Sequence, residues 1–114
     1  MKFTESLRKN RDFQTVYKNG RSKANKLFIM YVLENDQPVN RLGISVSKKV
    51  GNSVVRHRIK RLALEAYRLH EDMFNSGLNI VVIARPAAKD AAYQEVVSAI
   101  LHLASIHKIK NNLP

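Results

Sequence analysis

One stretch restricts how this chain can fold more than any other: KKVGNSVVRHRIKR, from Lys48 to Arg61. It holds seven positively charged side chains when His57 is protonated, and it contains no carboxylate. Packing cations together costs free energy, because like charges repel one another. The segment is therefore either a solvated helix face or a surface against which a strongly anionic partner normally lies.

The segment continues into a predicted amphipathic helix that runs from Asn52, a favourable N-cap residue, to about His70. Gly51 permits a tight turn before it. Apolar residues within about 80° of one another, at 100° per residue, form its core stripe: Val55, Ile59, Leu62, Ala66 and Leu69. The rest of the helix, where Glu65 is the only acid, carries the cations Arg56, His57, Arg58, Lys60, Arg61 and Arg68.

The other apolar patterns predict a sheet with further helices. Strands are expected at KLFIMYVL (26–33), RLGISVS (41–47) and LNIVVIARP (78–86), and helices at 10–20 and 90–107. The first two strands should run antiparallel because their connection is short. Gly20 is expected to end the first helix in a left-handed conformation, and the tail from Lys108 is expected to fray.

The resulting order is α-β-β-α-β-α, with an extra short strand near Ser22 to Asn25. This order indicates an α+β fold of the α/β-sandwich kind: one small mixed sheet with helices packed on it. A length of 114 residues is most economically one domain.

Composition points to a polyanionic partner. Twenty Lys and Arg against nine Asp and Glu give a formal charge of +11 and a pI near 10.3. A surplus of this size destabilises a compact fold, and nucleic acid is a more plausible reason for it than a membrane surface or simple solubility. The absence of cysteine excludes disulfides and thiolate chemistry. No signal peptide or apolar run of about 20 residues is present, so a cytoplasmic protein is expected.

A search for catalytic groups finds no constellation. The nine acids are scattered, His102 and His107 miss the i, i+4 spacing of a helical metal site, and no second acid or base accompanies His57. No phosphate-binding loop of the GxxxxGK kind occurs. Binding is therefore the class of function that remains. The guanidinium groups of Arg56, Arg58 and Arg61 could span a stretch of phosphate backbone. Phe13, Tyr17 and Tyr31 are either core residues or a surface on which single-stranded bases stack.

From about Leu7 to Leu103 the chain resembles the protein subunit family of bacterial ribonuclease P. The stretches that carry the resemblance are SLRKNRDFQTVYKNG, LGISVSKKVGNSVVRHRIKR and IVVIARPAA. The family's RNR signature falls on Arg56, His57 and Arg58. Two positions depart from the family pattern: His57 stands where Asn is usual, and Leu64 stands where Arg is frequent.

The resemblance implies a fold like the second domain of ribosomal protein S5, with a left-handed βαβ crossover. It also implies a ribonucleoprotein that removes the 5′ leader of precursor tRNA, in which the RNA subunit catalyses hydrolysis with magnesium ions. The protein would bind no cofactor, would need no protein partner, and would broaden substrate specificity. Contacts with the RNA subunit would come from Lys48, Lys49, Asn52, Arg56, His57, Arg58, Lys60, Arg61 and Arg68.

The resemblance further implies that the single-stranded leader lies in a cleft between the first helix and the sheet. Its matching positions are Phe13, Tyr17 and Tyr31, with Ser45 and Ser47 as neighbours. Two rival functions are a ribosomal or RNA-chaperone protein that uses the same basic helix, and a stand-alone nuclease that works through His57. Cleavage of precursor tRNA with and without the RNA subunit separates all three.

Overall fold

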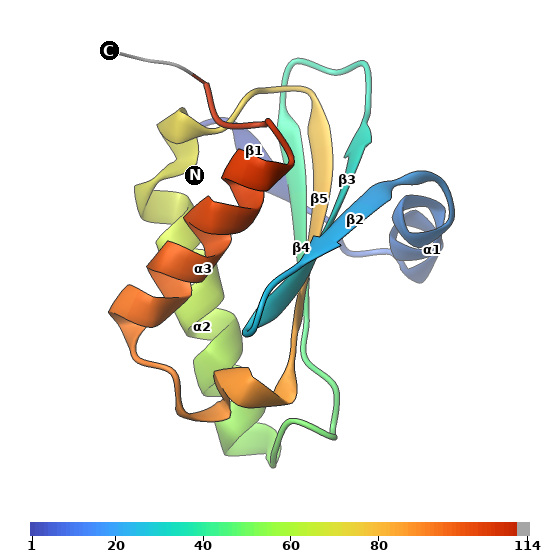
Figure 1. Ribbon diagram of the computed structural model, residues 1–114. Helices are drawn as coiled ribbons and strands as arrows, with labels where there is room; N and C mark the ends of the chain where they lie inside the picture. Colours follow the sequence, from blue (N-terminus) through green and yellow to red (C-terminus); the bar gives the residue numbers. More distant parts are fainter. Residues whose placement is uncertain (112–114) are drawn as a thin grey trace.

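The computed structural model describes residues 1–111, which form a five-stranded sheet and three α-helices (Figure 1). The strands are β1 (Thr4–Ser6), β2 (Arg21–Ala24), β3 (Phe28–Glu34), β4 (Asn40–Ser45) and β5 (Leu78–Ala84). The α-helices are α1 (Asn10–Asn19), α2 (Ser53–Leu69) and α3 (Tyr93–Ile106). Two short 3-10 helices, η1 (Glu71–Met73) and η2 (Pro86–Asp90), flank β5. The expected α+β class with a small mixed sheet is confirmed.

The strand order in the sheet is β1-β4-β5-β3-β2. Local sequence patterns indicate where strands lie along the chain but not which strands pair, so they could not predict this order. The expected opposite directions of β3 and β4 are confirmed, since β5 is antiparallel to β3 and parallel to β4. The two strands do not pair, however, because β5 lies between them. Sequence analysis also missed β1, which is only three residues long and pairs in parallel with β4.

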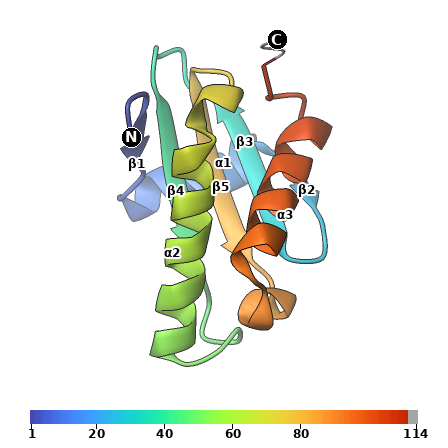
Figure 2. The same cartoon turned by 90° about the vertical axis from the view of Figure 1, so that its left-hand side faces the viewer.

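The unit β4-α2-β5 is a left-handed crossover. In Figure 2 α2 lies in front of the sheet, both strands run downwards, and β5 stands to the right of β4. Most parallel crossovers have the opposite hand. The arrangement places α2 over β4, next to the edge of the sheet.

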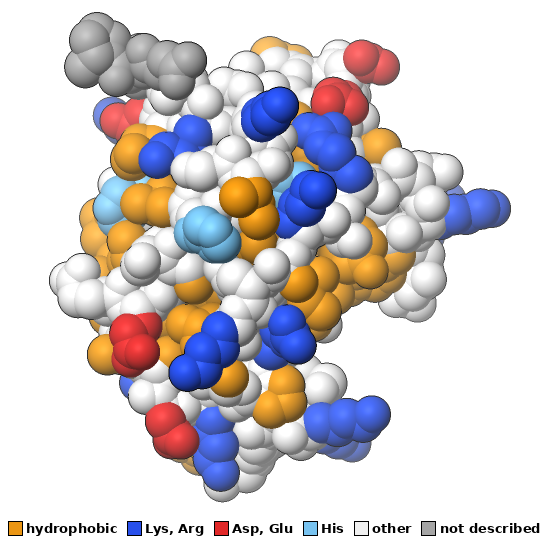
Figure 3. Space-filling view, in the orientation of Figure 1, with side chains coloured by type: hydrophobic (Ala, Val, Ile, Leu, Met, Phe, Trp, Pro, Cys, Tyr) orange, Lys and Arg blue, Asp and Glu red, His pale blue; other side chains and the backbone are white. Residues whose placement is uncertain are grey.

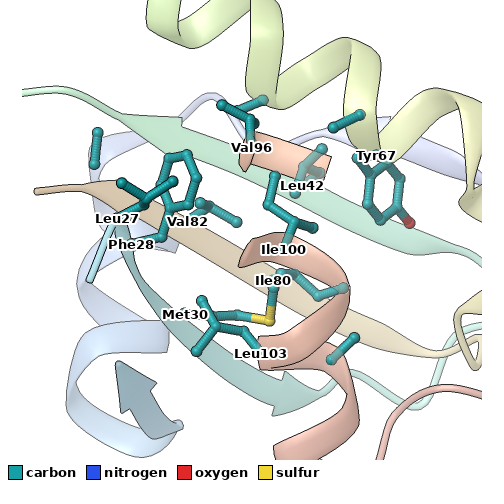
Figure 4. Close-up of a cluster of buried hydrophobic side chains, with 14 of the residues drawn as sticks. Leu27, Phe28, Met30, Leu42, Tyr67, Ile80, Val82, Val96, Ile100 and Leu103 are labelled. Carbon is teal, nitrogen blue, oxygen red and sulfur yellow. The ribbon is translucent and has the colours of Figure 1, made fainter. Parts of the chain in front are cut away.

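Each face of the sheet has its own hydrophobic cluster. The larger one lies under α2 and α3, where Phe28, Met30 and Ile80 meet Tyr67 and Ile100 (Figure 4). The smaller one lies under α1 on the opposite face and contains Leu7, Val16 and Val81 (Figure 1). The strand β3 is covered on both sides, because its fully buried residues alternate with half-buried ones.

Two details of helix packing differ from expectation. Leu69 is 54% exposed and does not belong to the core stripe of α2, whereas Ala63 and Tyr67 are buried. Gly20 has an extended backbone, with φ −80° and ψ 164°. A glycine is needed there because a Cβ would lie 2.6 Å from the Val16 carbonyl oxygen and 3.0 Å from that of Val32.

The segment after α3 is held in place as far as residue 111. Ile109 is buried, its carbonyl accepts the Asn75 N–H at 2.7 Å, and Asn111 N–H donates to the Met73 carbonyl at 2.9 Å. Fraying from Lys108 is therefore wrong for the described part of the tail, and the expectation for 112–114 lies outside the described residues. Within residues 1–111, no helix is long and apolar enough to cross a membrane.

Candidate nucleic-acid interface

The N-terminus of α2 is capped as expected. The Asn52 side-chain oxygen accepts a hydrogen bond from the Val55 N–H at 3.0 Å. The first turn of the helix contains no acid, and Lys48 and Lys49 are exposed in the turn before it. A helix N-terminus carries partial positive charge and favours anions, so two adjacent lysines are unfavourable unless an anion is bound there. Asn52 contributes to the site indirectly, because its cap fixes the residue at which α2 begins.

We call the exposed cations of α2 and its preceding turn the cationic face: Lys48, Lys49, His57, Arg58, Lys60, Arg61 and Arg68. Among residues 1–111 the ion pairs are Arg21–Glu34, Arg41–Asp12 and Arg68–Glu65. The hydrogen bond from Arg68 lowers the pKa of Glu65, so this pair neutralises itself. No described carboxylate pairs with a cation between Lys48 and Arg61.

Arg58 has a structural contact that sequence analysis missed. Its guanidinium donates to the Ala91 carbonyl at 2.8 Å and to the Lys89 carbonyl at 3.4 Å. These carbonyls lie in η2 and the turn that leads into α3, so Arg58 ties α2 to the segment that connects β5 with α3. No sequence signal could have found this contact, because any residue type at 89 and 91 presents a carbonyl.

Arg56 and His57 border the same hollow but differ in exposure. Arg56 is half-buried, and its Nε is buried without a hydrogen-bond partner among the described residues. It lines a hollow of about 370 Å³ against β4, together with Ser45 and Lys60. His57 is exposed at the rim of this hollow and also lines a second one with Arg58 and Arg61. All the charged side chains around it are therefore cations.

The predicted aromatic residues gather on the opposite face of the sheet. The ring centroids of Tyr17 and Tyr31 are 5.1 Å apart, edge to face, and those of Phe13 and Tyr17 are 6.4 Å apart. All three rings are half-buried, so they belong to the smaller cluster and also keep a surface. We call Phe13, Tyr17 and Tyr31 the aromatic platform.

Two residues of β4 shape this platform. Phe13 lies so close to Gly43 that a Cβ there would be 2.5 Å from its ring. Burial raises the pKa of Tyr17, and the polar side chain of Ser45 nearby partly offsets that effect. Ser45 adjoins Tyr17 and also lines the hollow beside Arg56, whereas Ser47 is exposed beyond the end of β4.

The remaining histidines do not form a site. His102 is exposed, and its Nδ1 lies 3.2 Å from the Asn25 side-chain nitrogen. His107 is buried, with its Nε2 2.8 Å from the Met30 carbonyl oxygen. In the described part of the chain, no three His, Asp or Glu side chains converge as a metal site would require.

The surplus of cations is not confined to α2. Figure 3 shows Lys and Arg side chains spread over the face where α3 and β2 lie in front, with fewer Asp and Glu near its edges. The stretch from Lys48 to Arg61 differs from this background by its density, because it holds seven cationic residues, His57 included, and no carboxylate. It is the surface on the described chain best suited to a run of phosphates.

Comparison with known proteins identifies the family. The model of the family Ribonuclease P matches residues 1–108. The ribonuclease P protein component of Lachnoclostridium phytofermentans is 58% identical over 106 residues, which cover 93% of this chain and 91% of the relative. The structure of the Staphylococcus aureus RNase P protein aligns with a TM-score of 0.86 at 41% identity, over 93% of this chain and 97% of the other.

A more distant structure agrees. The RNase P protein from Thermotoga maritima aligns with a TM-score of 0.83 at 31% identity, over 94% of this chain and 99% of the other. Family model, sequence relatives and solved structures all span nearly the whole chain and give the same answer. The chain belongs to the bacterial ribonuclease P protein family.

Proposed function

We propose that the cationic face binds the phosphate backbone of the ribonuclease P RNA subunit, and that the aromatic platform binds the single-stranded 5′ leader of precursor tRNA. Membership of the family makes the chain the protein subunit of ribonuclease P, the ribonucleoprotein that processes the 5′ end of tRNA, and makes the RNA subunit its partner. The proposal assigns each of these two RNAs to a surface.

The observation that carries the proposal is the unpaired charge from Lys48 to Arg61. No carboxylate in residues 1–111 pairs with any of these cations, and two of them precede a helix N-terminus that already favours anions. RNA phosphates would remove this repulsion, and the gain in free energy would appear as affinity. Lys48, Lys49, Lys60 and Arg61 are exposed and available for such contacts, with His57 between them.

Arg56, Arg58 and Arg68 have more restricted roles in the proposal. Arg58 uses part of its guanidinium on the carbonyls of Lys89 and Ala91, and Arg68 shares its charge with Glu65. Arg56 would contact RNA from within the hollow that it lines together with Ser45. The strongest phosphate contacts are therefore expected from Lys48, Lys49, Lys60 and Arg61, while Asn52 acts through the helix cap.

The leader assignment rests on the platform's rings and surroundings. Three half-buried aromatic rings next to small side chains suit the stacking of unpaired bases, which does not depend on base identity. The platform lies on the face of the sheet opposite to α2, so the leader and the RNA subunit would occupy different sides of β4 (Figure 1). Ser45 is the residue expected to lie near both.

We also assign the hydrolytic step, and the magnesium ions that support it, to the RNA subunit. His57 would bind phosphate, because an imidazole donates one hydrogen bond when neutral and two when protonated. A cytoplasmic location follows from the same proposal and stays a prediction.

The test is cleavage of precursor tRNA by the chain alone, by the RNA subunit alone, and by both together, with His57→Asn as the variant. We expect no cleavage by the chain alone and full activity of the complex with His57→Asn. Cleavage by the chain alone that disappears with His57→Asn would instead make the protein a nuclease and overturn the assignment.

A further inference from the structure

A third hollow lies at the sheet edge, between the segment that follows β1 and the helix α2. It measures about 390 Å³ and is lined by apolar groups of four separate elements: Leu7, Phe13, Ile44 and Leu64. Arg8 and Lys60 stand among the lining residues, and none of the lining residues is acidic. We call it the edge hollow.

The floor of the edge hollow is an open strand edge. The last backbone hydrogen bond between the N-terminal segment and β4 joins the Leu7 N–H to the Leu42 carbonyl at 2.8 Å, whereas β4 continues to Ser45. Asn40 donates toward the same side, to the Phe3 carbonyl at 2.8 Å. Backbone groups alternate along a strand, so the N–H and C=O of Ile44 also face this side, where the described chain offers no strand partner.

One wall of the edge hollow is an apolar side chain in an unusual place. Leu64 is 39% exposed in the middle of the cationic face, where solvation would favour a charged residue. Lys60 precedes it by one helical turn and lines both the edge hollow and the hollow beside Arg56. The site therefore combines an apolar wall, a free backbone donor and acceptor, and cations within one helical turn.

We propose that the edge hollow binds one unstacked nucleotide of the ribonuclease P RNA subunit. Its base would lie against Leu64 and Ile44, its hydrogen-bonding edge would meet the free N–H and C=O of Ile44, and its phosphate would pair with Lys60 and Arg8. The inference rests on the proposed function of the cationic face, with which the hollow shares Lys60. An added peptide strand would also use the open edge, but the cations and the missing carboxylates favour a nucleotide.

The test uses the fact that the chain contains no cysteine. Leu64→Cys places a thiol in the edge hollow, and Leu69→Cys places one at the exposed leucine of the same helix outside it. The rate of alkylation by a small maleimide is measured for both variants, with and without the RNA subunit. We expect RNA to slow the reaction about ten-fold or more at Leu64→Cys, as burial in an interface excludes reagent and water, and to leave Leu69→Cys nearly unchanged.

A second variant tests whether Leu64 binds the RNA subunit through an apolar contact rather than through charge. Leu64→Ala should weaken binding of the RNA subunit about five-fold without changing its salt dependence, because no charge is removed. Leu69→Ala, its matched control, should leave both the affinity and the salt dependence as they are.

The other outcomes are distinct. Equal alkylation of both variants in the presence of bound RNA would overturn the edge hollow and leave the cationic face intact. Failure of the wild-type chain to bind the RNA subunit would overturn both proposals. Protection of Leu64→Cys by raised protein concentration alone would indicate a second copy of the chain, and protection only on adding precursor tRNA would indicate the leader. Either result would contradict the assignment to the RNA subunit.

Discussion

Neighbouring residues of the arginine-rich signature do different work in this chain. Arg58 donates to two backbone carbonyls at the entry to α3, whereas Arg61 is exposed and has no carboxylate partner among the described residues. Arg56 lies between these extremes, with its Nε buried and the side chain lining a hollow. A loss of activity on changing one of them therefore has a different physical cause in each case.

The arginines make this difference testable. Arg58→Ala should lower the free energy of unfolding by about 1 kcal/mol, because two charge-assisted hydrogen bonds to the backbone are lost. Arg61→Ala should leave stability unchanged and weaken binding of the RNA subunit. Urea unfolding and RNA affinity are measured on both variants, and an equal stability for the two would contradict the structural role of Arg58.

His107 links stability to pH. Burial lowers its pKa below 6.5, and the cations Arg21 and Lys23 lower it further, although the hydrogen bond to the Met30 carbonyl opposes the shift. A carbonyl can only accept, so Nε2 carries the proton, and protonating the buried Nδ1 would leave it without an acceptor in the described chain. The neutral ring is the form that the fold prefers.

The sign of the effect follows from linkage. Below pH 6.5 the unfolded chain protonates His107 while the folded chain does not, so stability is full above that pH and falls as pH drops toward the folded pKa. The slope cannot exceed about 1.4 kcal/mol per pH unit for one proton. His107→Gln, which keeps an N–H donor but does not titrate, should flatten the dependence measured by urea unfolding between about pH 5.5 and 7.5. An unchanged dependence would contradict the role assigned to His107.

At the scale of elements, α1 and β4 together determine the shape of the aromatic platform. Asp12 of α1 pairs with Arg41 of β4 at 3.3 Å, and Gly43 leaves room for the ring of Phe13. The rings are thus held by packing before any ligand binds, which lowers the entropy cost of stacking a base on them. The platform should act as a preformed surface.

Tyr17 tests that surface. Stacking contributes about 1–3 kcal/mol per base, so Tyr17→Ala should weaken binding of precursor tRNA by the complex about ten-fold or more. Tyr17→Phe keeps the ring and loses only the hydroxyl beside Ser45, so it should bind nearly as wild type. Mature tRNA lacks the leader, and its affinity should barely change in either variant. Equal losses for precursor and mature tRNA would mean that Tyr17 serves only the core.

Elements with strong local signals could be predicted, and those that depend on distant pairing could not. The Asn52 cap and the apolar spacing predicted α2 to within a residue at each end. The strand β1, with the sequence TES, has no apolar period and exists because β4 pairs with it. The insertion of β5 between β3 and β4 likewise depends on long-range contacts, and so does the edge hollow, whose walls come from segments far apart in the chain.

The same reasoning explains the errors at single residues. Gly20 was expected to provide a positive φ, but close approach to two carbonyls requires it instead. Leu69 fits the apolar stripe by angle, yet the helix ends there and nothing covers it among the described residues. Ile109 lies in a basic tail and is buried because η1 and the segment after it provide backbone partners. The spacing of apolar residues predicts on which face of a helix or strand a residue lies. It does not predict which other segment packs against that face.

At the scale of the whole molecule, the left-handed crossover separates two surfaces across one sheet. The helix α2, which carries the cationic face, and the helix α1, which carries Phe13 and Tyr17, lie on opposite faces of the sheet (Figures 1 and 2). The strand β4 contributes to both sides, through Ser45 and Ile44. On the proposed function, the chain would therefore hold two RNA segments on opposite sides of one strand.

The central claim is that RNA phosphates neutralise the cationic face of α2. Its most direct test is the salt dependence of affinity for the RNA subunit, measured for wild type, for Lys49→Ala plus Arg61→Ala, and for Lys23→Ala plus Lys26→Ala as a charge-matched control on the β2–β3 hairpin. If about 5–8 phosphates are engaged, log affinity should fall with log salt at a slope of roughly −4 to −6. The α2 pair should flatten this slope by about two units, one for each lost contact, and the hairpin pair should leave it nearly unchanged. An unchanged slope for the α2 pair, or equal flattening by both pairs, would contradict the account.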